Sequence, residues 1–245
     1  MDLIKRKKII PINFDTAVLD EADEMLNMGF RDDIEKILSK LSHHRQTLLF
    51  SATMPKEILK ITNEFMNDPM MFEVAKRNEG AKNIEHICYY VSNKDKFYTL
   101  KRICDFNPNI YGIVFCRTRR ECNEISDKLM NSGYNADTLN GDLSQNQRDL
   151  VMKKFRNKTV QILVATDVAA RGIDVDDITH IINYSLPDDN EIYVHRSGRT
   201  ARAGKKGISI VIASNRQKKK INSIERMISK DFLTDDVPSN ETVSY

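Results

Sequence analysis

The sequence has few cysteines and no long hydrophobic run, and both absences narrow what the chain can be. Its four cysteines form no C-x-x-C pair, so neither a zinc site nor a disulfide framework is expected. Cys88 and Cys116 lie in apolar stretches, which predicts buried thiols in a reducing cytosol. No stretch approaches the roughly 20 apolar residues that a membrane-spanning helix needs. The basic N-terminus lacks the apolar core of a signal peptide, so we expect a soluble, cytoplasmic protein.

A further absence concerns phosphate binding. The pattern G-x-x-x-x-G-K followed by Ser or Thr, whose amides and lysine cradle nucleotide phosphates, occurs nowhere in the 245 residues. The chain as written therefore cannot hold a nucleoside triphosphate in that manner. The net charge of +3 gives only a weak indication of a polyanionic partner. Local clusters of residues must carry any argument about binding.

Short apolar runs alternate with amphipathic helical stretches along the chain. This alternation predicts an α/β fold with a doubly wound parallel sheet covered by helices. In residues 1–74 we expect helices at Arg31–Ser42 and Pro55–Met66, and strands at Thr16–Asp20, Thr47–Phe50 and Met71–Val74. Such apolar strands need neighbours on both sides. Residues 1–74 therefore predict the back half of a domain whose front half would be encoded upstream.

Residues 75–83 are polar and contain Gly80, which predicts a linker. The pattern then restarts, and residues 84–229 contain enough strands for one complete doubly wound domain. We expect strands at His86–Val91, Tyr111–Cys116, Asn135–Leu139, Gln161–Ala165, His180–Tyr184 and Gly207–Ala213. Helices are expected at Lys94–Cys104, Thr118–Ser132, Ser144–Asn157, Glu191–Ser197 and Arg216–Ser229. Residues 230–245 have little apolar content and predict a flexible tail.

Two adjacent carboxylates, Asp20 and Glu21, follow the first expected strand. An aspartate at the carboxyl edge of a sheet can bind Mg²⁺ through water, and the next carboxylate can polarise an attacking water. A strand that leads into an acidic first helical turn is common, and Asp-Glu alone would favour that structural explanation. Asp23, together with Ser51-Ala52-Thr53 after the next strand, favours a catalytic role instead.

A dense cationic segment lies much further along the chain, at His195–Arg202. Arg199 and Arg202 are three residues apart, and if this turn is helical their guanidiniums share one face. The planar fork of arginine matches phosphate oxygens and can face the charge of a phosphoryl group in transfer. An isolated pair of this kind would indicate a solvated cationic face. With Asp20 and Glu21 upstream, the segment predicts hydrolysis of a nucleoside triphosphate between two lobes.

These segments belong to a longer series of motifs. The sequence contains, in order, Asp20-Glu21-Ala22-Asp23, Ser51-Ala52-Thr53, Gly112–Thr118, Gln145–Arg148, Ala165–Val175 and His195–Arg202. In this order and spelling they resemble the motifs of the DEAD-box RNA helicases, and they cover nearly the whole chain. The resemblance implies RecA-like folding, with one complete C-terminal lobe and the back half of an N-terminal lobe.

The resemblance also implies roles at the nucleotide. Asp20 would hold Mg²⁺ through water, and Glu21 would activate the hydrolytic water. Arg199 and Arg202 would reach the phosphates of ATP. Two further sets are implied: Asp23, Ser51, Thr53 and His195 would couple nucleotide state to lobe closure, and Asp174, with Gly172 beside it, would bind the ribose.

RNA is the other partner that the resemblance implies. The residues that would contact RNA phosphates are Arg117, Gly141, Arg148 and Thr166. Contact with the backbone alone would make binding largely independent of sequence and sensitive to salt. We expect a monomer that binds RNA and ATP and does not bind membranes.

The sequence departs from the family pattern in two places. Ala201 stands where the sixth motif usually has glycine, and alanine is small enough for the turn to form. The P-loop lysine and the adenine-reading segment are absent, so we expect no measurable ATPase from this chain alone. Two alternatives to an ATP-dependent RNA helicase stay open: a non-catalytic module that binds the RNA backbone, and a DNA-directed translocase. The Asp-Glu-Ala-Asp spelling argues against the translocase.

Overall fold

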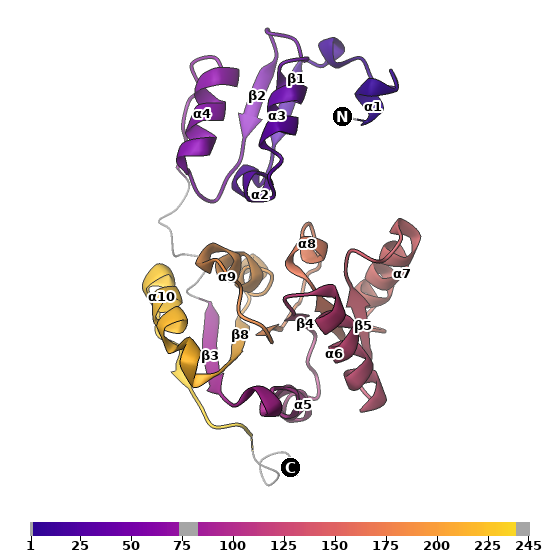
Figure 1. Ribbon diagram of the computed structural model, residues 1–245, viewed down its shortest axis with the longest axis vertical. Coiled ribbons are helices and arrows are strands. Elements are labelled where there is room, and N and C mark those ends of the chain that lie inside the picture. The colour runs from indigo at the N-terminus through magenta and orange to yellow at the C-terminus, as the bar shows by residue number, and fades with distance from the viewer. Residues whose placement is uncertain (1, 74–82, 239–245) are drawn as a thin grey trace. The chain divides into compact units, whose positions relative to one another are not determined.

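The computed structural model describes residues 2–73 and 83–238, and the chain divides into two units, Met1–Val74 and Ala75–Tyr245 (Figure 1). Each unit has its own sheet and its own hydrophobic core. The expected linker at 75–83 lies outside the described residues, apart from Asn83.

The first unit is built on two parallel strands, β1 (Thr16–Leu19) and β2 (Gln46–Leu49). Its helical segments are α1 (Asp2–Lys5), the 3-10 turn η1 (Pro11–Asn13), α2 (Ala22–Asn27), α3 (Arg31–Leu38) and α4 (Lys56–Phe65). The four-residue spacing of Ile34 and Leu38 on α3 and the three-residue spacing of Ile58 and Ile61 on α4 place these side chains in the core, as helical periodicity predicts. The predicted strands and helices at these positions are confirmed.

The strand expected at Met71–Val74 is wrong for the part that the structure describes. Residues 71–73 have no regular structure, and Val74 lies outside the described residues. Met71 and Phe72 are 70% and 77% exposed. Within the described ranges no other strand pairs with this segment, and an apolar run without a neighbour cannot form a ladder.

The second unit contains a seven-stranded sheet in the order β5-β6-β4-β7-β8-β3-β9, and every pair is parallel. Its strands are β3 (Ile84–Tyr90), β4 (Gly112–Phe115), β5 (Ala136–Leu139), β6 (Ile162–Ala165), β7 (His180–Asn183), β8 (Gly207–Ala213) and β9 (Leu233–Thr234). Its helices are α5 (Lys96–Phe106), α6 (Arg119–Asn131), α7 (Gln145–Arg156), α8 (Asp167–Ala170), α9 (Asn190–Ser197) and α10 (Lys218–Ile228), with 3-10 turns at η2 (Asn93–Asp95), η3 (Arg202–Gly204) and η4 (Asn215–Gln217). The six strands expected here are all present.

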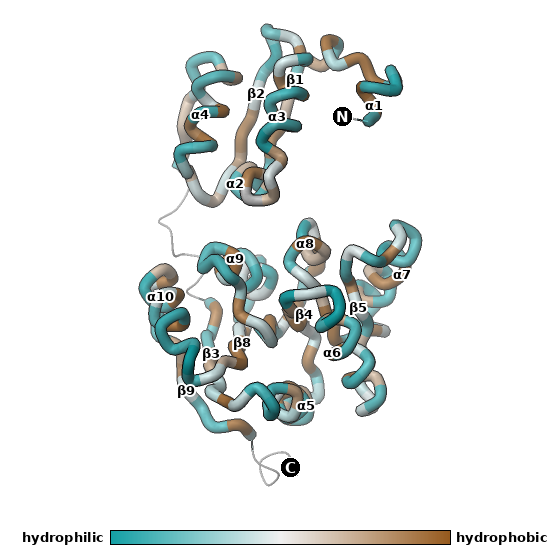
Figure 2. Tube along the Cα trace, viewed as in Figure 1, coloured by the Kyte–Doolittle hydropathy of each residue, from teal (hydrophilic) through white to brown (hydrophobic). Residues whose placement is uncertain are grey.

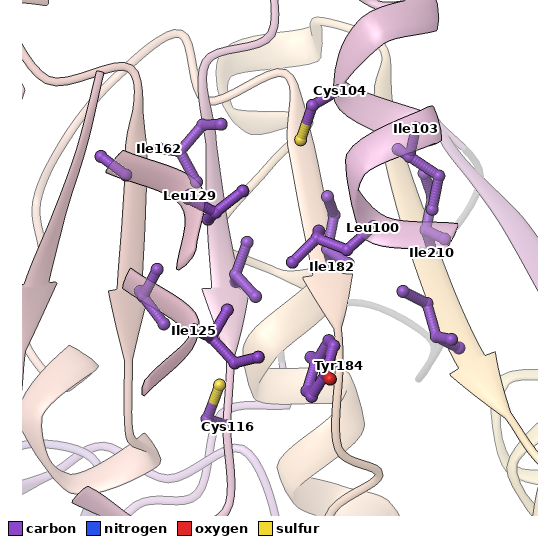
Figure 3. Close-up of a cluster of buried hydrophobic side chains, with 14 of the residues drawn as sticks. Leu100, Ile103, Cys104, Cys116, Ile125, Leu129, Ile162, Ile182, Tyr184 and Ile210 are labelled. Carbon is purple, nitrogen blue, oxygen red and sulfur yellow. The ribbon is translucent and has the colours of Figure 1, made fainter. Parts of the chain in front are cut away.

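Helices cover both faces of this sheet. On one face, Leu100 and Ile103 of α5 and Ile125 and Leu129 of α6 pack on β4, β6, β7 and β8 (Figure 3). The opposite face carries α7, α9 and α10, whose apolar side chains form two further clusters. Hydrophobic stretches run along the strands, whereas the outer helices are largely hydrophilic (Figure 2). The predicted α/β fold with a doubly wound parallel sheet is confirmed.

The C-terminal segment differs from the expected flexible tail at 230–245. Leu233 and Thr234 pair with Ile87 and Cys88 of β3, and Phe232 is buried in the core. The reason is that Phe232 supplies enough apolar surface to hold this short edge strand in place. Residues 239–245 lie outside the described residues.

The sequence predicted neither a membrane-spanning helix nor a disulfide framework. None of the helices within 2–73 and 83–238 combines the length and apolar character that a membrane crossing requires. All four cysteines are buried and unbridged. Burial raises the pKa of the Cys88 thiol to about 11, which keeps it protonated at neutral pH.

Candidate functional site

The carboxylates Asp20 and Glu21 lie where β1 ends. Asp20 is exposed, and its Oδ1 accepts a hydrogen bond of 2.9 Å from the amide of Glu21. Glu21 has a φ of +50°, in the left-handed region that costs a residue other than glycine about 1–2 kcal/mol. The amide of Ala22 donates to the carbonyl of Phe50 at 3.0 Å, so the loop after β1 is attached to the loop after β2.

Asp20 fits a magnesium ion held through water. Across residues 2–73 and 83–238, no three His, Cys, Asp or Glu side chains gather into a group that could hold a metal ion. A single exposed carboxylate suits a Mg²⁺ ion that keeps several waters and takes its remaining ligands from phosphate oxygens.

Asp23 is buried and holds the segment after β2. Its Oδ2 accepts two hydrogen bonds of 2.9 Å from Thr53, one from the amide and one from the hydroxyl. Ser51 completes the group, since its hydroxyl accepts from the amide of Asp23 at 3.2 Å and donates to the carbonyl of Thr53 at 2.7 Å. The structure thus brings together three of the four residues expected to couple nucleotide state to closure. The fourth, His195, lies half-buried on α9 of the second unit.

In the second unit, three of the expected RNA contacts lie at one edge of the sheet. Arg117 follows β4, Gly141 follows β5 and Thr166 follows β6. These strands are neighbours in the order β5-β6-β4 and are parallel, so their carboxyl ends meet at the same edge. Thr166 is also the N-cap residue of α8. The side chain of the fourth candidate, Arg148 on α7, reaches the carbonyl of Arg171 at 3.4 Å.

Arg117 is held beside the loop that follows β7. Its Nη2 lies 3.3 Å from the carbonyl of Leu186 and 3.2 Å from the carboxylate of Asp188. Its amide donates to Glu121 at 2.7 Å, and Glu121 also accepts from the hydroxyl of Ser185 at 2.8 Å. The side chains of Arg117 and Asp188 are 57% and 82% exposed, so a phosphate could compete with this aspartate.

Arg196 has a different role from the other arginines of the cationic segment. Its side chain is 2% exposed, and its guanidinium donates two hydrogen bonds to Asp167, of 2.5 Å and 2.8 Å. Its Nη1 donates to Asn183 at 2.9 Å and to the carbonyl of Ser185 at 2.7 Å. The ring of Phe115 lies 4.8 Å away. Arg196 is therefore an internal tie between α9 and α8 and does not belong to a solvated cationic face.

Arg199 and Arg202 come after the end of the helix. α9 ends at Ser197, and Ala201 has a φ of +57° before the short turn η3 begins at Arg202. The turn that carries the two arginines is therefore not one continuous helix, and they do not share a helical face, contrary to the expectation for a helical turn with three-residue spacing. The turn forms with Ala201 in the glycine-favouring region, at the cost that a side chain brings there.

The two arginines nevertheless converge with the expected ribose contact. Arg199 donates to the carbonyl of Ile173 at 3.3 Å, and Arg202 pairs with the carboxylate of Asp174 at 3.2 Å. Asp174 is 92% exposed, and Gly172, with a φ of +66°, lies two residues before it. The structure therefore gathers Gly172, Asp174, Arg199 and Arg202 in one place.

A hollow of about 160 Å³ adjoins these arginines. Its lining includes the four cations Arg199, Arg202, Lys205 and Lys206 and the carboxylate of Asp177. A hydrogen bond from Lys205 lowers the pKa of Asp177, which therefore stays ionised. The excess of cations makes this surface suitable for an anionic ligand.

Sequence reasoning missed the residues that connect these places. No role was expected for Asp167, Asn183, Ser185 or Glu121, although Asp167 lies within the motif Ala165–Val175 and all four hold Arg196 or Arg117. Asp167 directly follows Thr166 and resembles an ordinary acidic residue in a first helical turn. The local sequence around Asp167 does not indicate that its partner lies 29 residues away.

Two family models match the chain. The model described as DEAD/DEAH box helicase matches residues 1–61, and the model described as helicase conserved C-terminal domain matches residues 95–204.

Curated relatives match over nearly the whole chain. The DEAD-box ATP-dependent RNA helicase CshA of Bacillus cereus is 44% identical over 239 residues, which is 98% of this chain and 46% of the relative. CshA of Bacillus subtilis is 45% identical over 226 residues, or 92% of this chain and 46% of the relative. The chain spans about half the length of these curated relatives.

Solved structures show the same similarity. Dbp5 of Saccharomyces cerevisiae, bound to RNA and ADP BeF3, is 29% identical, with a TM-score of 0.87 over 96% of this chain and 63% of that chain. A DEAD box protein of Methanococcus jannaschii is 44% identical, with a TM-score of 0.61 over 95% of this chain and 63% of that one. The Escherichia coli DEAD-box protein SrmB, bound to RraA, is 33% identical, with a TM-score of 0.59; the match covers 63% of this chain and 91% of that chain.

Proposed function

This chain belongs to the DEAD-box RNA helicase family, and we propose that its two units supply complementary parts of an ATP-dependent RNA helicase. The observation that carries the proposal is the convergence of Arg199 and Arg202 with Asp174 beside a hollow rich in cations. Guanidiniums gathered in this way suit the phosphates of ATP, and a neighbouring carboxylate suits a ribose hydroxyl. The proposed activity is RNA-stimulated ATP hydrolysis that drives local duplex unwinding.

The hydrolytic roles follow from where each side chain lies. Glu21 would polarise the attacking water, because its carboxylate follows the edge of β1 next to Asp20. Asp20 would hold Mg²⁺ through water, and that ion would neutralise charge on the phosphate oxygens. Arg199 and Arg202 would stabilise the charge that develops on the transferred phosphoryl group.

Coupling between hydrolysis and movement would begin at Asp23. This buried carboxylate accepts hydrogen bonds from the amide and the hydroxyl of Thr53, and Ser51 bridges the two residues. A shift of the Asp20–Asp23 loop would therefore move Ser51 and Thr53 with it. We place His195 in the same coupling set because its motif matches that of the family.

RNA would bind along the carboxyl edge of the second sheet. Arg117 and Arg148 offer guanidiniums, and Thr166, whose side chain makes no capping hydrogen bond on α8, offers a hydroxyl near the loop that contains Gly141. Contacts of this kind bind phosphates and carry no base readout, so affinity should fall steeply with salt. A cytoplasmic location and a monomeric state stay predictions.

Binding and hydrolysis can be tested separately. The purified chain should bind a fluorescein-labelled oligouridylate, with an affinity that falls as KCl rises, in a fluorescence anisotropy titration. Its ATPase rate should equal background with and without RNA, because no P-loop is present in the 245 residues. RNA-stimulated turnover by this chain would contradict the second expectation, and absence of RNA binding would contradict the first.

A chimera separates the helicase from the alternative, a non-catalytic module that binds the RNA backbone. The P-loop segment of CshA from Bacillus cereus would be joined ahead of residue 2. A helicase unit should then gain RNA-stimulated ATPase activity, and Glu21→Gln in the same chimera should abolish it. If the chimera binds RNA and nucleotide but never hydrolyses ATP, the binding module is the better account.

A further inference from the structure

We propose that Tyr193 is a positioning residue for the turn that carries Arg199 and Arg202, and that it acts through a buried hydrogen-bond network with His86, Ser197 and Ser209. We call these four residues the Tyr193 network. That the turn serves phosphate binding rests on the proposed function. The network itself rests only on contacts within the second unit.

The network joins α9 to two neighbouring strands. The hydroxyl of Tyr193 lies 2.5 Å from Nδ1 of His86 on β3 and 3.0 Å from the hydroxyl of Ser209 on β8. The same serine hydroxyl lies 2.9 Å from that of Ser197, the last residue of α9. Tyr193 and Ser197, four residues apart on the helix, therefore both contact the hydroxyl of Ser209 on β8.

The interior of the unit encloses these groups. Tyr193 and Ser209 are 0% exposed, and His86 and Ser197 are 2% and 3% exposed. The ring of Phe232 closes the site, with its centroid 5.5 Å from that of His86 and 5.6 Å from that of Tyr193. A hydroxyl buried in this way has no water to replace a lost partner, so its bonds are made in one geometry.

A helix held in this way cannot slide along its axis. Apolar packing tolerates small shifts, whereas a hydrogen bond weakens steeply outside its narrow range of distance and angle. On the buried face of α9, Arg196 adds a second polar tie through Asp167 and Asn183. The register of α9 on the sheet is thus set by hydrogen bonds at both Tyr193 and Arg196.

The arginine turn continues directly from the tied end of this helix. The amide of Arg199 donates to the carbonyl of Arg196 at 3.0 Å, and that of Thr200 donates to the carbonyl of Ser197 at 3.1 Å. Thr200 is buried, and its hydroxyl donates to the carbonyl of Ile178. A movement of the end of α9 would therefore pass through these two peptide hydrogen bonds to Arg199 and Thr200.

Tyr193→Phe removes the hydroxyl and keeps the ring, and the chain offers a matched control. Tyr111 is also buried, and its hydroxyl donates to the carbonyl of Phe155 at 2.9 Å in a different cluster. Tyr111→Phe should lower the stability of the second unit by a similar amount without touching α9. Both variants are measured by native-state amide hydrogen exchange of the full chain.

We expect Tyr193→Phe to speed exchange at the amides of Arg199 and Thr200 at least tenfold more than at the strand amides of β4 and β6. Tyr111→Phe should raise exchange evenly across the unit, through its global opening alone. A matching, even increase in both variants would show that Tyr193 only stabilises the fold and would overturn the proposal.

A milder variant guards against unfolding of Tyr193→Phe. Ser209→Ala removes the hydroxyl shared by Tyr193 and Ser197 and leaves the rings of Tyr193 and His86 in place, so it should produce the same local loss of protection at Arg199. Unchanged protection in Ser209→Ala would also overturn the proposal. RNA affinity through the Arg117 edge should stay within twofold in all these variants. If the wild-type chain fails to bind RNA, the proposed function is contradicted. The hydrogen-exchange comparison would still test the Tyr193 network, because it does not depend on RNA binding.

Discussion

Arg196 binds Asp167 through two parallel hydrogen bonds, Nε to Oδ1 at 2.5 Å and Nη2 to Oδ2 at 2.8 Å. The pair connects α9, which leads to Arg199, with α8, whose N-cap is Thr166. A site expected to face nucleotide phosphates and a site expected to face RNA phosphates are thus joined by one ion pair, whose arginine is buried and whose aspartate is 27% exposed.

Breaking this pair should destabilise the second unit strongly. Asp167→Asn leaves a buried guanidinium without its counter-charge. Removal of one partner from a fully buried pair costs about 3–5 kcal/mol, and because Asp167 is 27% exposed we expect a loss near the lower end, about 3 kcal/mol. Urea unfolding followed by tyrosine fluorescence measures this, because all eight tyrosines lie after residue 83 and report on the second unit. Asp142→Asn is the control: it breaks the exposed pair with Arg119, whose side chains are 63% and 55% exposed, and should cost less than about 1 kcal/mol. Equal losses in the two variants would contradict the assigned role of Arg196.

Ala201→Gly should stabilise the chain. The φ of +57° at Ala201 is costly for alanine, and glycine adopts it without steric conflict. After the greater loss of backbone entropy is subtracted, we expect a gain of about 0.5–1 kcal/mol. The midpoint of thermal unfolding of the second unit measures the change. Ala169→Gly, inside α8, should instead lower stability by about 1 kcal/mol, and a loss in both variants would show that the turn carries no strain.

The stability of the second unit should fall between pH 7 and pH 5. Burial lowers the pKa of His86 and of His180 to about 4, from the ordinary 6.5, and the charge of Lys230 adds to the effect at His86. Both rings are neutral when folded, so the unfolded chain binds more protons, and stability present above pH 6.5 is lost as the pH falls toward 4. Linkage gives a loss of about 2 kcal/mol for each histidine at pH 5.

Urea unfolding at the two pH values, followed by tyrosine fluorescence, tests this expectation. His180→Gln removes one of the two titrating groups and should reduce the pH-dependent loss by about half. A loss unchanged in that variant would assign the acid sensitivity to other groups.

Arg117 and Asp188 should affect RNA binding in opposite directions. Arg117→Ala removes a proposed phosphate contact and should weaken oligouridylate binding while reducing the salt slope by about 1. Asp188→Asn removes the carboxylate that lies 3.2 Å from Arg117. An exposed pair of this kind is worth about 0–1 kcal/mol, so binding should tighten up to about fivefold. Anisotropy titrations at several KCl concentrations measure both effects, and weaker binding in both variants would show that Asp188 does not compete with RNA.

Local sequence patterns predicted the strands because each is a short apolar run with polar borders. β4 and β6 are buried at every position, and this leaves an unmistakable pattern in a parallel sheet. β9 escaped prediction because two residues are too few to show any periodicity. Its place is decided by Phe232, whose ring packs on His86 and Tyr193 from far away in the sequence.

Contacts between residues of the recognised motifs could be predicted from the sequence. Contacts that depend on which strands are neighbours in the sheet could not. The contacts of Asp23 with Ser51 and Thr53 were expected from the motifs and are present. The pairing of Arg196 with Asp167 depends on which strands are neighbours, and no local pattern carries that information. The end of α9 at Ser197 was expected, but the left-handed Ala201 that separates the two arginines was not.

At Glu21, selection for stability and selection for a carboxylate would favour different residues, because its backbone is left-handed. A glycine or asparagine at this position would relieve backbone strain of about 1–2 kcal/mol and thereby raise the stability of the first unit. Either substitution would also remove the carboxylate from the end of β1. A laboratory evolution experiment that rewards heat resistance alone should therefore replace this glutamate early, and its persistence in a lineage would indicate selection for the carboxylate itself.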